Sequence, residues 1–174
     1  LMDKEVAKQY QVEASLDHGV MVPMYFIDKV YSDYKLVHLT PGYTELNENY
    51  EIGTLIQEVV RNSGENVVVV ASGDLSHTLS NQGPYAHHED GSAFDQCIKE
   101  SIKTADPLKL LELESEFIEN AAQCGLRSIL IGYGFLEGMS LSSRIMSYEG
   151  PFGVGYLTAE ITGEGSSDTS TLSH

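Results

Sequence analysis

The sequence is poor in basic residues and has no long apolar run. Only 10 Lys and Arg residues stand against 26 Asp and Glu residues, which gives a formal net charge of −16. This field would repel a polyanion, and no Lys/Arg cluster forms a local basic groove, so we expect no nucleic-acid partner. No apolar run approaches the ~18 residues of a membrane helix, so we expect no membrane association.

Cysteine is also scarce, with two residues, Cys97 and Cys124, and no CxxC pair. The first residues, LMDKEVAKQY, lack the apolar core of a signal peptide. Two thiols in such a chain are expected to be free, and the location is expected to be cytoplasmic. The length of 174 residues fits one domain.

The apolar pattern predicts a chain of the α/β class. Residues 66–72 (NVVVVAS) are apolar on both faces, which is typical of a strand at the centre of a sheet covered by helices. The order of elements predicts a mixed β-sheet with helices packed on its faces, over a domain of residues 1–161. The Gly/Ser/Thr-rich residues 162–174 are expected to be a disordered tail or linker. Helices are predicted at 3–14, 22–31 (with Pro23 in front as a cap), 47–61, 92–103, 106–113, 115–122 and 127–138, and strands at 35–39, 66–72, 142–150 and 153–161.

A polar segment follows directly after the valine strand. Ligands of such sheets bind beyond the carboxyl ends of strands, and Ser72 to His77 occupy this position. Gly73 would let the backbone approach a ligand closely, and Asp74 would orient the imidazole of His77. A histidine can give and take a proton near neutral pH, so His77 is a candidate acid or base. The alternative is a hydrogen-bonded structural histidine.

A second histidine has a similar setting. His18 lies between Asp17 and Gly19, and the same two interpretations apply to it. Asp17 would orient the imidazole of His18, and Gly19 would admit a ligand.

Cys124 precedes a predicted helix start and lies near Arg127. A helix start and a guanidinium both favour a thiolate, so the pKa of this thiol is predicted to be lowered. A thiolate is a soft metal ligand. The alternative is a small buried core residue.

Other polar residues have less specific patterns. Residues 87–90 (HHED) are adjacent, so their side chains diverge, and a solvated loop or a helix start capped by Asp90 is the preferred interpretation. Ser76 and His77 lack the GxSxG context of a serine hydrolase. Glu149 lies beside a Gly-Pro turn, and both a cleft position and a turn position stay open for it.

Four motifs in this order resemble one family: LDHGVMVPMYFI, ASGDLSH followed by GPY, CGLRSI, and SYEGPFGVGY. Together they are similar to the catalytic-subunit superfamily of class III extradiol ring-cleaving dioxygenases, of the protocatechuate 4,5-dioxygenase β-subunit type. Within it, the sequence resembles the AmmeMemoRadiSam branch, which also contains the Memo proteins. The resemblance covers about residues 3–161.

The resemblance implies ring cleavage of a catechol-type aromatic by O₂ with a non-haem Fe(II). It assigns proton transfer to His18 and His77, and we expect Ser72, Gly73 and Asp74 to bind the small aromatic substrate. A metal-dependent hydrolase is a third, less supported interpretation.

The resemblance also implies a metal-ligand set. In the family two histidines and a glutamate hold the iron, and both histidines would lie in a segment preceding residue 1. The chain thus resembles the C-terminal part of such a domain, and Cys124 matches the cysteine that Memo-like members carry in place of the glutamate. Another divalent metal is therefore an alternative to Fe(II), and a non-catalytic, Memo-like metal- or partner-binding protein is the alternative function. We expect pairing with the missing N-terminal segment, or a homo-oligomer, to cover exposed apolar surface.

Overall fold

The computed structural model describes residues 17–165, which fall into two units divided between Pro41 and Gly42. Each unit is described by itself. The helix predicted at 3–14 and residues 166–174 of the expected tail lie outside the described residues.

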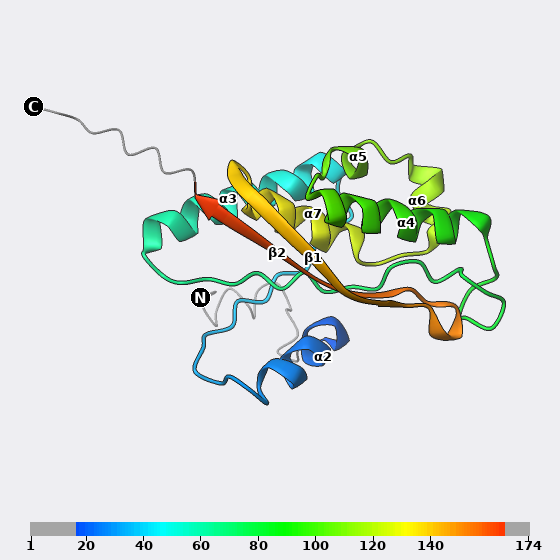
Figure 1. The fold of residues 1–174 in the computed structure, drawn as a ribbon, viewed down its shortest axis with the longest axis horizontal. Helices are drawn as coiled ribbons and strands as arrows, with labels where there is room; N and C mark the ends of the chain where they lie inside the picture. The colour runs from blue at the N-terminus through cyan, green and yellow to red at the C-terminus, as the bar shows by residue number, and fades with distance from the viewer. Residues whose placement is uncertain (1–16, 166–174) are drawn as a thin grey trace, which may run out of the picture. The chain divides into compact units, whose positions relative to one another are not determined.

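The N-terminal unit contains one described helix, α2 (His18–Ile27), drawn in blue in Figure 1. It begins four residues before the predicted helix at 22–31, because Asp17 caps it: the Asp17 Oδ1 accepts a hydrogen bond from the Val20 N–H at 3.0 Å. Pro23 lies inside the helix, so the prediction that it caps the start is wrong. Residues 35–39, predicted as a strand, form no ladder among the described residues.

The C-terminal unit contains the other predicted helices, with ends shifted by a few residues. The α4 helix is capped by the His88 Nδ1, which accepts from the Asp90 N–H at 3.2 Å, so the prediction of an Asp90 cap is wrong. In the described part of the chain no helix has both the length and the apolarity to cross a membrane. The helices are α3 (Leu46–Ser63), α4 (Glu89–Thr104), α5 (Leu108–Leu111), α6 (Ser115–Ala121) and α7 (Leu126–Phe135).

The core of this unit lies between α4, α7 and the short helices. On α4, Phe94, Ile98 and Ile102 share one face through their helical spacing, and all three are buried. Each such side chain stabilises the fold by about 1.5–3 kcal/mol relative to an exposed one. The buried cluster consists of Leu75, Phe94, Ile98, Ile102, Leu110, Ala121, Leu126, Leu130 and Tyr133.

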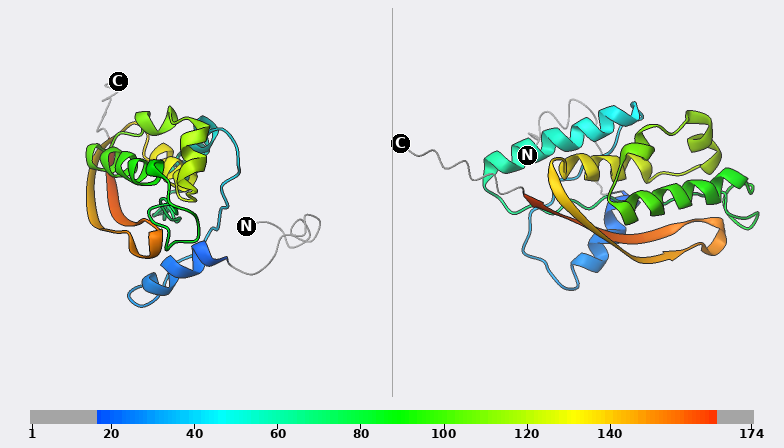
Figure 2. Two further views of the ribbon diagram at one scale, coloured as in Figure 1. Left: turned by 90° about the vertical axis from the view of Figure 1, so that its right-hand side faces the viewer. Right: turned by 45° about the horizontal axis from the view of Figure 1, so that its top comes forward.

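The sheet is a two-stranded antiparallel hairpin, β1 (Met139–Glu149) and β2 (Tyr156–Gly165), joined through the 3₁₀ turn η1 (Pro151–Gly153). Partly buried side chains from both strands pack on the core, and α4 contacts β1. Figure 2 shows the hairpin along one side of the helices of this unit. The α/β class is thus confirmed. Residues 162–165, expected within the tail, continue β2.

The valine segment differs from its prediction. Residues 66–72 belong to no strand, and Val67, Val68 and Val70 are 42%, 87% and 49% exposed. A strand exists only where a neighbour completes its hydrogen-bond ladder, and no segment among the described residues pairs with this one. The apolar side chains of this segment suit a buried strand, but residues 17–165 contain no neighbouring strand that pairs with it.

Candidate functional site

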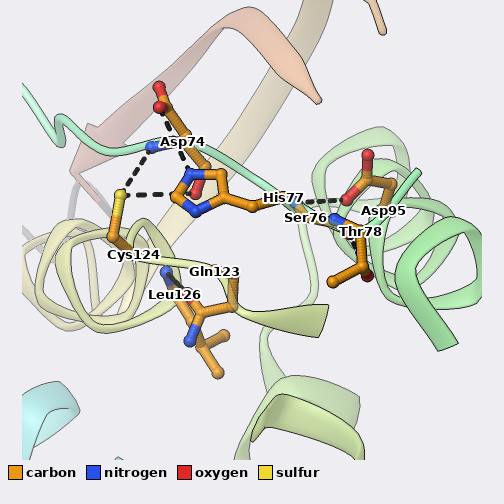
Figure 3. A network of polar contacts seen from close by, with 8 residues as sticks. All are labelled: Asp74, Ser76, His77, Thr78, Asp95, Gln123, Cys124 and Leu126. Atoms are coloured by element: carbon orange, nitrogen blue, oxygen red, sulfur yellow. Dashed lines mark hydrogen bonds and ion pairs between the residues drawn. The ribbon is translucent and has the colours of Figure 1, made fainter. Parts of the chain in front are cut away.

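Three side chains from two distant segments converge in the C-terminal unit. Asp74 and His77 lie three residues apart after the valine segment, and Cys124 lies between α6 and α7 (Figure 3). One carboxylate oxygen, one imidazole nitrogen and the sulfur all lie within 4.8 Å of one another. The His77 Nε2 is 3.4 Å from the Asp74 Oδ2, in keeping with the expected orienting role of Asp74.

The backbone that carries Asp74 and His77 is held along its whole length. Each of the six consecutive N–H groups from Asp74 to Leu79 donates a hydrogen bond, so the segment is ordered without being a helix or a strand. In chain order the acceptors are Cys124 Sγ at 3.1 Å, Gly155 O at 2.9 Å, Asp95 Oδ1 at 2.7 Å, Ala121 O at 2.9 Å, Ser76 Oγ at 3.0 Å and Gly153 O at 3.1 Å.

Two glycines let the two segments cross. A Cβ on Gly73 would lie 2.5 Å from the Gly125 Cα. Gly73 also has a φ of +154°, which residues other than glycine rarely adopt. The close crossing lets the Asp74 carbonyl accept from the N–H groups of Cys124 and Gly125, at 3.3 and 2.9 Å. Gly73 thus approaches the chain's own backbone, and the crossing places the thiol of Cys124 beside Asp74.

The thiol of Cys124 has a different electrostatic setting from the predicted one. Burial raises its pKa and the Asp74 charge adds to this, while the hydrogen bond from the Asp74 N–H opposes both. The predicted lowering is therefore wrong. Arg127 does not provide the expected positive charge, because its Nε donates to the Thr44 carbonyl at 3.3 Å and its guanidinium lies 5.4 Å from the Tyr43 ring. A bound metal would be needed to favour the thiolate.

An aromatic ring covers the imidazole of His77. Tyr85 stacks on it with ring centroids 5.9 Å apart and planes 11° from parallel. The His77 side chain is 17% exposed, so one part of the ring stays open to a ligand. Sequence reasoning assigned no role to Tyr85, although the GPY motif contains it.

Two buried polar residues behind the site were also missed. Asp95 on α4 is fully buried and accepts from the Ser76 N–H, while Tyr148 on β1 donates to the same carboxylate at 2.7 Å. A sequence signal existed, because Asp95 is a carboxylate on the apolar face of α4 between Phe94 and Ile98.

The structure places the first predicted histidine in the N-terminal unit. His18 is exposed and is the first residue of α2. Asp17, expected to orient it, caps the helix, and its Oδ2 lies 3.8 Å from the Nε2 of His38. The roles of His18 stay a prediction.

The remaining polar candidates lie as follows. Ser72 is half-buried beside Gly73, and the substrate-binding roles of both stay a prediction. Ser76 is fully buried, and its Oγ lies 3.1 Å from the Thr78 Oγ1, so it cannot reach a substrate as a nucleophile. Glu149 is exposed at the end of β1. Both cysteines are free, as predicted.

The donor set fits a divalent transition metal. Asp74, His77 and Cys124 offer an oxygen, a nitrogen and a sulfur, a mixture that suits zinc and iron better than magnesium or calcium. Among the described residues, no other group of His, Cys, Asp or Glu has this spacing.

Comparison with known proteins gives a consistent result. Residues 1–159 match the family model of the catalytic LigB subunit of aromatic ring-opening dioxygenase. Protein CA_C1420 of Clostridium acetobutylicum is 39% identical over 168 residues, which cover 97% of this chain and 36% of that protein. A MEMO1 family protein of Archaeoglobus fulgidus is 22% identical over 147 residues, covering 84% of this chain and 53% of that protein.

A second MEMO1 family protein, from Pyrobaculum arsenaticum, is 29% identical over 115 residues, 66% of this chain and 38% of that protein. The chain thus spans between about a third and a half of the length of these relatives. The LigB family generally uses a metal, which agrees with the donor set formed by Asp74, His77 and Cys124. The family match covers nearly the whole chain. The chain therefore belongs to the family of the catalytic LigB subunit of aromatic ring-opening dioxygenases, in the branch of the class III extradiol dioxygenases that includes the MEMO1 proteins.

Proposed function

We propose that this chain forms part of an extradiol dioxygenase-like protein that opens a catechol-type ring with O₂ and Fe(II). The observation that carries the proposal is the convergence of Asp74, His77 and Cys124 within 4.8 Å, in a chain whose family is that of ring-opening dioxygenases. Free thiols and a ferrous ion both suit a reducing compartment, so the proposed location is the cytoplasm.

Cys124 would hold the metal from this chain, and two histidines preceding residue 1 would complete its protein ligands. The iron would supply binding of O₂ and of the two ring oxygens. Asp74 accepts a hydrogen bond only when the Nε2 of His77 carries the proton, which leaves the Nδ1 lone pair to take a proton from a substrate hydroxyl. His18 would provide the second proton-transfer group.

Tyr85 and Asp74 would shape the substrate side of the site. The exposed Tyr85 ring, stacked on His77, offers an apolar face on which a small aromatic substrate can pack. Ser72, Gly73 and Asp74 would contact the substrate where the crossing segments meet.

A second function is supported by the thiol. If Cys124 matches the cysteine of Memo-like proteins, it would put a sulfur where the dioxygenases carry a carboxylate, and several relatives are MEMO1 family proteins. A thiolate ligand changes the potential of an iron and favours other metals. The second candidate is therefore a non-catalytic, Memo-like protein that binds a metal or a partner at the same site.

The test uses the natural protein that contains residues 1–174. Elemental analysis after anaerobic purification measures its metal, and O₂ uptake with catechol and protocatechuate measures ring cleavage. We expect about one iron per chain, and a loss of about 10²–10⁴ in turnover on His77→Asn, the range typical of a removed general acid or base. His87→Asn is the matched control, because His87 is an exposed histidine of the same loop.

The outcomes separate the two functions. Bound metal without O₂ uptake on any catechol would support the Memo-like function. Unchanged turnover in His77→Asn would exclude the proposed role of His77, and turnover that survives Cys124→Ala with full iron content would exclude Cys124 as a ligand.

A further inference from the structure

Asp95 is a fully buried carboxylate outside the cluster of Asp74, His77 and Cys124. Its Oδ1 accepts from the Ser76 N–H and its Oδ2 from the Tyr148 hydroxyl, each at 2.7 Å. Burying an ionised carboxylate without partners is costly, and short hydrogen bonds to both oxygens offset that cost. The contact with Ser76 is visible in Figure 3.

Tyr148 is placed to keep donating to Asp95. Burial and the neighbouring carboxylate both raise the pKa of the Tyr148 hydroxyl, so it stays protonated at neutral pH. The Lys99 Nζ, also on α4, lies 4.1 Å from the centre of the Tyr148 ring, a cation–π contact that helps to hold the ring against this helix. The hydroxyl therefore holds the Asp95 carboxylate from β1.

The chain between η1 and β2 closes around the same carboxylate. A Cβ on Gly155 would lie 2.1 Å from the Asp95 Oδ2, so a residue with a side chain would collide with the carboxylate at this position. The Gly155 N–H donates to the Ser76 carbonyl at 2.8 Å, and its carbonyl accepts from the Leu75 N–H at 2.9 Å. The backbone at Ser76 is thus fixed from α4, from β1 through Tyr148, and from the turn before β2.

Ser76 lies between the two functional residues of its segment. A shift of its backbone would move Asp74 on one side and His77 on the other, and with them their distances to the Cys124 thiol. Functional side chains generally need such supporting contacts to hold their separation.

We propose that Asp95, held by Tyr148, is a positioning residue that fixes the backbone at Ser76 and thereby sets the placement of Asp74 and His77 relative to Cys124. The inference rests on the proposed function in treating these three residues as the site. Asp95 itself is not one of the three residues of the cluster.

The test compares two tyrosine hydroxyls in the natural protein that each contact a side chain of α4. Tyr148→Phe removes the donor to Asp95, whereas Tyr133→Phe removes a hydroxyl that lies 3.1 Å from the Oγ of Ser101, six residues further along α4. Two signals are measured: the ¹⁵N and ¹H resonances of the His77 ring in metal-free protein, and the affinity for Co²⁺ in competition with a chromophoric chelator.

We expect Tyr148→Phe to move the His77 ring resonances and to weaken Co²⁺ binding by about tenfold, the lower end of the loss typical of supporting residues at metal sites. Tyr133→Phe is expected to leave the resonances in place and the affinity within about twofold. Asp95→Asn should keep the Co²⁺ affinity within about twofold of the wild type, because its amide can still accept from Ser76 and can donate to the Tyr148 oxygen.

Equal responses of His77 to Tyr148→Phe and Tyr133→Phe would overturn the proposal. So would an Asp95→Asn variant that weakens Co²⁺ binding as much as Tyr148→Phe does. A wild-type protein that binds no Co²⁺ would contradict the proposed function alone, since the His77 resonances test the positioning role without metal. If Tyr148→Phe does not fold, adding Asp95→Asn should restore folding by removing the unpaired charge, and failure to do so would overturn the proposal.

Discussion

Two adjacent segments of the C-terminal unit differ sharply in how many of their backbone groups form hydrogen bonds. Within residues 17–165, Val67 to Ala71 form no backbone hydrogen bond, and Val68 is 87% exposed. A few residues later, each N–H from Asp74 to Leu79 has a partner, and Leu75 is 2% exposed. The more apolar of the two segments is the less buried.

The difference shows that burial here follows from partners rather than from composition. The first segment needs a neighbouring strand, which no described residue provides. The second uses single contacts from α4, from the end of α6 and the loop that follows it, and from the turn before β2, all of which lie within the described residues. The backbone N–H groups of the candidate-site segment therefore all have partners among the described residues, while those of the valine segment do not.

The largest expected effect comes from shortening one apolar side chain in each segment. Leu75→Ala should lower the free energy of unfolding by about 2–5 kcal/mol, because Leu75 belongs to the core cluster. Val68→Ala should change it by no more than about 0.5 kcal/mol. Urea denaturation of both variants measures the contrast. A Val68→Ala cost as large as that of Leu75→Ala would break the comparison and show that the valine segment is buried in the natural protein.

A smaller contrast is expected at two glycines with positive φ. Gly64→Ala, at the end of α3, has nothing within 4 Å of the added Cβ, so only the left-handed backbone is penalised, by about 1–2 kcal/mol. Gly73→Ala adds a collision with the Gly125 and Cys124 backbone, for about 1–3 kcal/mol more. Thermal unfolding of the two variants gives the difference. Equal costs would mean that the crossing is looser than the structure shows.

The smallest effect concerns pH. Burial raises the pKa of the Asp95 carboxyl, although hydrogen bonds from Tyr148 and Ser76 and the charges of Lys99 and His77 oppose it. The folded state then holds this proton more tightly than the unfolded one, and that stabilisation is full below the ordinary carboxyl pKa and is lost as the pH rises through the folded value. Asp95→Asn lacks this dependence.

The free energy of unfolding of Asp95→Asn, relative to wild type, should therefore increase from about pH 4 upward. Urea titrations of both proteins at several pH values provide the measurement. A difference that decreases with rising pH would show that the carboxyl pKa is lowered by folding.

Helices were predictable where the apolar spacing was regular and local. The spacing of Ile52, Leu55, Ile56 and Val59 gave α3 within about two residues. Helix starts were less accurate, because caps depend on single side chains: Asp17 for α2 and His88 for α4. The β1–β2 hairpin was predicted as two strands, but its reach to Gly165 was not, since the sequence there is rich in glycine and threonine.

The members of the Asp74, His77 and Cys124 cluster were predictable from the sequence, but the residues that support it and its electrostatics were not. The histidine, the carboxylate and the thiol were all identified from their motifs, and the structure brings Asp74, His77 and Cys124 together. The thiol pKa was predicted with the wrong sign because local sequence does not show where Arg127 points. Asp95 was missed because its partners, Ser76 and Tyr148, are 19 and 53 residues away in the sequence.

The complete use of N–H groups from Asp74 to Leu79 also limits how a ligand can be recognised. With all six donors directed at the protein itself, this segment has no backbone amide to form an oxyanion hole. A ligand that binds beside this segment would therefore be recognised by side chains: the ring of His77, the carboxylate of Asp74 and the sulfur of Cys124. Single side-chain substitutions at these positions should accordingly change the selectivity for the ligand, while the course of the backbone stays unaltered.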